Sequence, residues 1–401
     1  MRVAKYLVTL VAVACVPLLS HAVELKMTSS TQYLWYEDIL ADDNEQDLAE
    51  AFRLNVSKID KDGKINVYGY GRGSKQISSD EDARGRLYYF YVDYRDALKN
   101  HLDLRAGRTF VHSAAVSGTI DGAYLDFRNL GPVGVTLFGG RNVIFDDKRE
   151  VGTRGDALAG ISVYYDTIKN THVEVSFGRK YRDTDVARES VGLDFSTTPI
   201  GQVNFYGRLK YDTIAETYNE ILFGAKMTPM KDVILRGEYY QSYATFDTIS
   251  IYSVFAVDKY KEGSLSAEYR LSGKYRVSAR YAKEDFGGDA DADLFEVGFL
   301  ANPIKDLTLN ATYEKRDGYA GSLNGIRLHG EYKISRATLQ AGIDYDDFRR
   351  ELSRDGTAKK YWGAVNYELS KLVSAVLRAE DNINFSHENS YQGFAAVNLN
   401  F

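Results

Sequence analysis

The C-terminal stretch, residues 391–401, alternates between two kinds of side chain. The odd-numbered positions hold Tyr, Gly, Ala, Val, Leu and Phe, and the even-numbered positions hold Gln, Phe, Ala, Asn and Asn. A period of two places these sets on opposite faces of one β-strand. The sequence ends on Phe401 and brings no later segment to cover the apolar face. We therefore expect this face to contact lipid, which requires no covering layer of protein.

The N-terminal segment has the pattern of a secretory signal peptide. Arg2 and Lys5 precede an apolar run at residues 6–19, and Ser20-His21-Ala22 has the small-x-small form of a cleavage site. A transmembrane anchor needs about 20 apolar residues, which is more than this run supplies. We predict a signal peptide at residues 1–22.

The predicted mature chain, residues 23–401, contains no cysteine. Cys15 is the only cysteine, and it lies inside the predicted signal peptide. Further apolar residues follow it, which argues against a lipoprotein cleavage site. The mature chain therefore cannot form disulfides, cysteine-ligated clusters or a c-type haem attachment.

The composition favours a barrel over a helical membrane protein. The chain has 31 tyrosines, 34 glycines and 5 prolines, with a net charge of −6. Its mean hydropathy is −0.35, too polar for a bundle of membrane helices. A transmembrane barrel keeps its lipid contacts on alternate residues, so its average stays polar, and interfacial girdles use many aromatic residues. A large secreted all-β protein remains the soluble alternative, and we expect no nucleic acid as partner.

The mature chain repeats one unit, in which two alternating runs are joined by a polar cluster and followed by a tight turn. Prolines 132, 199, 229 and 303 all fall at such turns, as expected for a residue that cannot donate to a sheet ladder. The ten turns are 59–63, 98–101, 129–132, 167–171, 198–201, 228–232, 272–274, 302–306, 335–336 and 370–371. They predict an all-β, transmembrane, antiparallel up-and-down β-barrel of about 22 strands, with 18 to 22 acceptable, in a single domain.

The predicted strands keep an apolar and a polar face. In residues 307–316 the apolar face is Leu307, Leu309, Ala311 and Tyr313, and the polar face is Thr308, Asn310, Thr312, Glu314 and Arg316. Apolar outside and polar inside is the arrangement of a membrane barrel. The least clear region is 243–263, which reads as a strand or as a long loop folded inward; we interpret it as part of one outer loop.

The closing hairpin resembles that of Gram-negative outer-membrane porins. Tyr367-Glu368-Leu369-Ser370-Lys371 is similar to the Tyr-x-Leu-Ser-Lys turn of that family, and the chain ends on a phenylalanine as porins do. The sequence departs from the family at Leu372-Val373, where Arg-Thr is frequent. The resemblance implies that the terminal strand is recognised by the barrel assembly machinery. The residues that would carry this signal are Ala395, Val397, Leu399 and Phe401.

The signals for catalysis or metal binding are weak. Asp289-x-Asp291-x-Asp293 has the spacing of a calcium loop, but Leu294 and Leu300 replace its glycine and its bidentate acid. The Gly69-x-Gly71-x-Gly73 run lies inside an alternating strand and opens no helix. The neighbouring pairs His112-Ser113 and Ser386-His387 would point to opposite faces of a strand. We expect no catalytic residue, metal or cofactor, although an outer-membrane enzyme stays a third possibility.

Charged residues recur on the polar faces and predict the lining of a pore. The candidates are Arg72, Arg105, Arg208, Arg236, Arg276, Arg280, Arg316, Arg378, Glu238, Glu284, Glu314, Glu368 and Glu380. Cross-strand ion pairs also keep a polar wall ordered, and we expect about half of these residues to serve only that purpose. The leading interpretation is an outer-membrane porin of a Gram-negative bacterium that passes small hydrophilic solutes or ions.

The expected diameter of the barrel suggests an alternative function. A ring of about 22 strands has a diameter of roughly 44 Å, and barrels of that size are usually plugged. The alternating pattern of strands starts near Glu24, so we expect no plug domain before it. The outer loops also look too short for any of them to fold inward and fill the lumen. The barrel could instead be a sheath for a partner such as a multihaem cytochrome in an electron conduit. The solute, the ion selectivity and the oligomeric state do not follow from the sequence.

Overall fold

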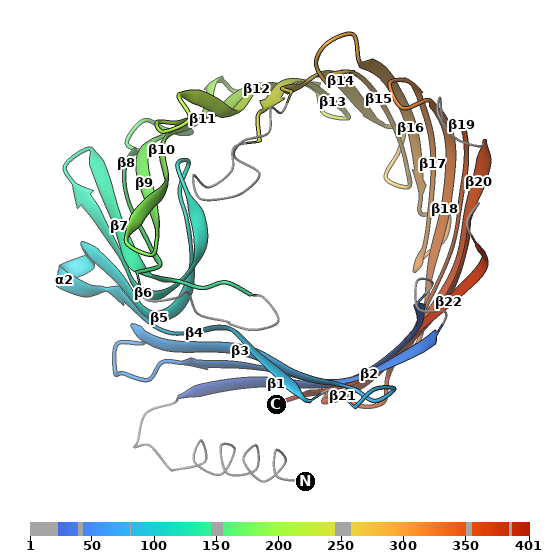
Figure 1. Cartoon of the computed structure of the whole chain (residues 1–401), viewed down its shortest axis with the longest axis horizontal. Helices are drawn as coiled ribbons and strands as arrows, with labels where there is room; N and C mark the ends of the chain where they lie inside the picture. Colours follow the sequence, from blue (N-terminus) through green and yellow to red (C-terminus); the bar gives the residue numbers. More distant parts are fainter. Residues whose placement is uncertain are drawn as a thin grey trace.

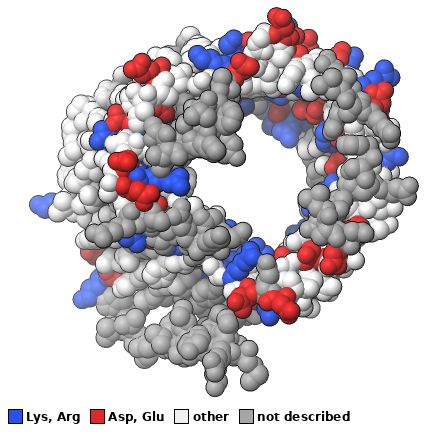
Figure 2. Space-filling view, in the orientation of Figure 1, with Lys and Arg blue, Asp and Glu red and all other residues white. Residues whose placement is uncertain are grey.

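The computed structural model describes residues 23–38, 43–80, 82–145, 155–244, 258–349, 355–384 and 387–401. The predicted signal peptide lies outside the described residues. The described chain forms one antiparallel sheet of 22 strands that closes into a ring (Figure 1). The space-filling view shows an opening through its centre (Figure 2).

Each strand pairs with its neighbours in sequence, and β1 pairs with β22 to close the ring. The predicted architecture and strand number are therefore confirmed. The strands are β1 (Glu24–Asp38), β2 (Asp43–Ser57), β3 (Ile65–Gln76), β4 (Arg84–Asp96), β5 (Leu102–His112), β6 (Ser117–Leu130), β7 (Val133–Asn142), β8 (Ala157–Tyr165), β9 (Thr171–Arg182), β10 (Asp185–Ile200), β11 (Val203–Asp212), β12 (Thr217–Met230), β13 (Val233–Ser242), β14 (Tyr260–Arg270), β15 (Tyr275–Asp285), β16 (Asp291–Ala301), β17 (Leu307–Gly318), β18 (Ser322–Ile334), β19 (Ala337–Arg349), β20 (Gly356–Glu368), β21 (Val373–Asn384) and β22 (His387–Asn400).

All ten predicted turns coincide with connections at one end of the barrel. The connection between β4 and β5 holds a four-residue helical turn, α2 (Ala97–Asn100). In the turn between β2 and β3, Gly63 adopts a φ of +68°, and the Ile65 N–H donates to the Asp60 carboxylate at 2.8 Å. This backbone hydrogen bond lowers the pKa of Asp60 below its ordinary value.

Two prolines lie nearer to the sheet than the sequence predicted. Pro199 and Pro229 fall within β10 and β12, one residue before each strand ends. The pairing register shifts between Thr197 and Ile200 and between Met227 and Met230, so neither proline has to donate to the ladder.

The region 243–263 is only partly an outer connection. Residues 260–263 belong to β14, where they pair with β13, so this part of the loop assignment was wrong. Residues 245–257 lie outside the described residues.

One face of the strands exposes large apolar side chains. In β17 and β18, Leu309 is 43% exposed and its neighbour on the same face, Leu328, is 47% exposed. Asn310 and Arg316 project from the opposite face, in agreement with the predicted alternation. No helix among the described residues is long and apolar enough to cross a membrane.

Candidate functional site

The tip of the β5–β6 hairpin leaves the barrel wall and folds into the lumen, where it is drawn in teal inside the ring (Figure 1). Pairing of β4 with β5 stops at Arg108, whereas β5 and β6 stay paired up to His112 and Ser117. The bend begins at Gly107, whose φ of +127° favours glycine. The segment that folds inward is therefore formed by the ends of two strands. The lengths of the predicted outer loops could not reveal it. The expectation that no outer connection folds inward was wrong.

A small apolar core holds the hairpin tip against the inner wall. Its members are Val111, Val116, Ile120, Phe138 and Leu158. The Ala115 N–H donates to Ser176 Oγ at 2.8 Å, and the Ala114 N–H donates to Glu174 Oε1 at 3.0 Å. Ala115 is fully buried. Backbone donors of the tip thus find partners on β9, as buried N–H groups require.

The wall beneath the tip is built from small residues. A Cβ at Gly178 would overlap Val116, and a Cβ at Gly192 would overlap the backbone of Ala114 and Ala115. This contact identifies the inner face of β9 and β10. Because directly paired residues project from the same face, the pairing register extends the assignment around the whole barrel.

The side of the hairpin that faces the lumen carries Phe110 and His112. Phe110 is 58% exposed, and the two rings stack with centroids 6.5 Å apart. Arg108 anchors the hairpin, because its Nε and Nη2 donate to Asp121 at 2.8 and 3.0 Å and its Nη1 donates to Leu87 O at 2.8 Å. The hairpin thereby narrows the lumen with a fixed, partly aromatic surface.

Two ion pairs join residues that the sequence singled out. Arg316 Nε donates to Glu284 at 2.8 Å, and Arg378 Nη2 donates to Glu380 at 2.9 Å. Lys360 also donates to Glu380, at 3.0 Å. All these residues lie on the inner face by the pairing register.

Most other candidates pair with residues that sequence reasoning missed. Arg105 contacts Asp93 at 3.3 Å, Arg208 contacts Asp194 at 2.8 Å and Arg276 contacts Glu268 at 3.2 Å. Arg280 pairs with Glu262. Glu314 accepts from Arg327 at 3.3 Å, and Glu238 accepts from the Tyr206 hydroxyl at 2.7 Å. The partner of a residue on the neighbouring strand cannot be identified from the sequence until the pairing register is known.

Three candidates have a different setting. Arg72 lies opposite Arg86 of β4, and Arg236 lies opposite Lys226 of β12, so each faces a like charge. Glu368 is the last residue of β20, at the short-turn end and away from the middle of the lumen. Figure 2 shows charged side chains of both signs along the opening. Whether they line a path for solutes remains a prediction.

The proposed assembly residues belong to the strand that closes the ring. Ala395, Val397 and Leu399 are paired with Tyr33, Thr31 and Ser29 of β1. The backbone of Phe401 exchanges two hydrogen bonds with Met27, at 2.8 and 3.1 Å. The terminal residue therefore completes the seam, whereas its recognition by assembly machinery remains a prediction.

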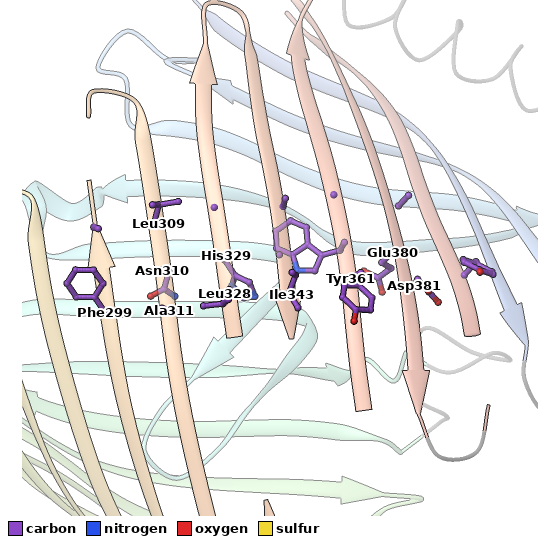
Figure 3. Close-up of a pocket in the computed structure, with 18 residues that line it drawn as sticks. Phe299, Leu309, Asn310, Ala311, Leu328, His329, Ile343, Tyr361, Glu380 and Asp381 are labelled. Atoms are coloured by element: carbon purple, nitrogen blue, oxygen red, sulfur yellow. The ribbon is translucent and has the colours of Figure 1, made fainter. Parts of the chain in front are cut away.

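A depression of about 890 Å³ spans β16–β22 (Figure 3). Its lining includes Gly330, Ala341, Gly363 and Ala379, which are paired in one continuous row. Exposed Leu309, Leu328 and Ile343 lie in or next to this row on the outer face. An apolar depression on that face suits no hydrophilic solute, so we take the lumen as the candidate site.

No family model matches the chain, and no curated protein matches it. Solved structures do match. OpdQ of Pseudomonas aeruginosa has a TM-score of 0.50 at 12% identity, over 95% of this chain and 99% of that chain. OpdK of Pseudomonas aeruginosa, solved with vanillate, has a TM-score of 0.49 at 10% identity, over 95% and 98%.

A BenF-like porin from Pseudomonas fluorescens Pf-5 has a TM-score of 0.48 at 12% identity, over 95% of this chain and 99% of that chain. At such identities the likeness concerns the fold alone. The strand pairing and the likeness to OpdQ show that this chain has the porin-like outer-membrane β-barrel fold that its terminal strand and turn predicted.

Proposed function

We propose that this protein is a channel for small hydrophilic solutes in the outer membrane of a Gram-negative bacterium. The observation that carries the proposal is the closed 22-stranded ring with apolar side chains outside and ion pairs inside. An apolar outer wall matches lipid, and a polar inner wall keeps a lumen hydrated. Membrane lipid and the barrel assembly machinery are the partners this role requires.

The charges of the lumen fit a channel through which solutes diffuse better than a channel that selects solutes of one sign of charge. Along the inner face several arginines are paired with acids, as in Arg208–Asp194 and Arg316–Glu284. Paired charges present dipoles across the opening rather than a field of one sign. The inward β5–β6 hairpin supplies the size limit, because it occupies part of the lumen that an unobstructed ring would leave open.

Structural neighbours do not identify the solute. OpdK was solved with vanillate, and OccK2 (OpdF) of Pseudomonas aeruginosa was solved in complex with glucuronate. Both ligands are small and polar, which is consistent with the proposed class of solute. We propose transport rather than catalysis, because inner-face acids such as Glu262 and Glu284 are engaged in ion pairs with arginines, an arrangement that orders a polar wall.

The sheath alternative gains no support from the described residues. A guest protein would have to share the lumen with the β5–β6 hairpin, which is packed against the wall by its own core. Co-purification of a haem protein with the barrel from native membranes would support the sheath alternative.

Conductance in a planar lipid bilayer tests the channel directly. We expect the refolded mature chain to give stable ion currents, and proteoliposomes to swell in small sugars and amino acids but not in large polymers. Heat-modifiable migration on a gel serves as the folding control. A correctly folded barrel that neither conducts nor admits solutes would overturn the proposal.

A further inference from the structure

A row of aromatic rings runs along the inner face of β3 and β4. Tyr68 is paired with Tyr91, and Tyr70 is paired with Tyr89. The register shifts beside Tyr70, so that Tyr88 as well as Tyr89 stacks near it. The successive centroid distances are 5.7 Å for Phe145–Tyr88, 5.0 Å for Tyr88–Tyr70, 5.8 Å for Tyr70–Tyr89, 5.9 Å for Tyr89–Tyr91 and 5.3 Å for Tyr91–Tyr68.

The row leads from one end of the barrel into the lumen. Phe145 follows the end of β7 on the side opposite the ten short turns, and Tyr68 lies near the short-turn end of β3. The five tyrosine rings are half-buried, so part of each remains accessible. Interfacial girdles place aromatic residues on the lipid face, and they do not explain rings on the inner face.

Cationic side chains accompany the rings. The guanidinium of Arg53 lies 5.3 Å from the Tyr70 centroid, and that of Arg86 lies 5.6 Å from the Phe145 centroid. Arg105 lies 5.0 Å from the neighbouring Tyr124 ring and 3.3 Å from Asp93, which is only 2% exposed. The surface thus combines apolar ring faces with phenol and guanidinium donors at their edges.

We infer that this aromatic row binds linear oligosaccharides and guides them through the lumen, an inference that rests on the proposed channel function. A sugar ring has an apolar C–H face that can stack on an aromatic ring, and hydroxyls at its edge that can accept from guanidinium and phenol groups. A simple ion has no apolar C–H face that could stack on the rings. Because neighbouring rings are closely spaced, a sugar leaving one ring already contacts the next. Binding then stays nearly uniform along the path, without a steep barrier between positions.

Sugar-dependent block of the ion current tests the inference. In planar bilayers holding the wild-type mature chain, we expect maltohexaose or cellohexaose to interrupt the current at millimolar concentration, and glucose to do so far more weakly. The double substitution Tyr70→Leu with Tyr89→Leu should weaken the block about tenfold while the sugar-free conductance stays close to wild type. Tyr269→Leu, a matched change on the outer face, should leave the block unchanged.

A binding assay in detergent keeps the inference testable if the double variant fails to fold. Tyr70→Trp should report maltohexaose or cellohexaose as a change in tryptophan emission, compared with the parent chain, which holds two tryptophans. A wild-type channel that conducts ions but shows neither block nor binding with both hexaoses would overturn the inference and leave the channel proposal standing. Block by benzoate or vanillate alone would also overturn it. Absence of conductance would count against the channel itself, and the emission assay would then decide the binding.

Discussion

The indole of Trp35 lies over Gly393, its cross-strand partner on the outer face of the seam between β1 and β22. A Cβ at Gly393 would overlap the indole. The same outer row continues through Ala379 and Gly363, so small residues on three strands are followed by one large ring on the fourth. The seam, which joins the two ends of the chain, is thereby packed in one register only.

Gly393→Val should weaken closure of the barrel. The added side chain has to displace the Trp35 indole, and overpacking of this kind costs about 1–3 kcal/mol. We expect a lower midpoint in urea unfolding, followed by gel migration of the folded band. Gly363→Ala, whose Cβ would meet only the Gln340 carbonyl oxygen at 3.9 Å, is the matched control. Equal destabilisation by both changes would contradict the seam packing.

Phe401→Ala should reduce assembly into the outer membrane while export continues. The motivation is an exposed terminal ring on the strand whose backbone completes the seam at Met27. The readout is the amount of heat-modifiable barrel in outer-membrane fractions, with periplasmic accumulation as the sign of successful export. Asn400→Ala, at the neighbouring inner-face position, should change the yield little. Normal barrel levels for Phe401→Ala would count against the assembly signal.

Leu309→Arg and Asn310→Arg should have very different effects. Leu309 projects from the outer face, where arginine near the membrane midplane costs roughly 2–4 kcal/mol. Asn310 projects from the opposite face, opposite His329 of β18, where a charge can stay hydrated. Unfolding of each variant in lipid vesicles by guanidinium measures the difference. Similar losses for both variants would refute the assignment of the two faces.

Replacing Arg208, Arg236, Arg280 and Arg378 by glutamate should shift the channel towards cations. Three of these arginines pair with Asp194, Glu262 and Glu380, so their replacement leaves Asp194 and Glu262 without an arginine partner and Glu380 with Lys360 alone. Reversal potentials in a salt gradient should move most at low ionic strength, where screening is weak. Conductance should remain large because the wall is unchanged.

A matched control for this selectivity change lies on the outer face. Replacing Lys261, Lys283, Lys315 and Lys359 by glutamate reverses the same number of charges on the face opposite the lumen. The reversal potential of this control should move much less. An equal shift in both variants would show that net charge, rather than the lumen, sets the selectivity.

Gly178→Val should release the hairpin tip from the inner wall. The new side chain would occupy the position of Val116, so residues 113–116 could not stay packed on β9. We expect a higher single-channel conductance and passage of larger solutes, since the tip would no longer be fixed in the narrow part. Gly263→Val, whose Cβ meets no atom within 4 Å, controls for the loss of a strand glycine. An unchanged conductance with a folded barrel would show that the tip does not limit the lumen.

The sequence by itself determined the barrel. Period-two alternation in strands such as β11 and β17 fixed which residues share a face, and the ten turns fixed the number of strands. These signals are local, because the pleat of a strand and the chemistry of a tight turn depend on neighbouring residues. The prediction that charge gathers on the face opposite Leu309 follows from the same periodicity.

Tertiary structure alone decided what occupies the lumen. The inward bend at Gly107, the contact of Val116 with Gly178 and the row through Tyr70 and Tyr89 each depend on strand register or on approach of segments far apart in sequence. Alternation cannot distinguish a strand that stays in the wall from one that leaves it, because the pleat places side chains alternately on two faces in both cases. Likewise, the partner of Arg208 could not be identified from the sequence. Asp194 lies opposite Arg208 only in the observed pairing register, and a shift by one residue would turn Asp194 to the other face of the sheet.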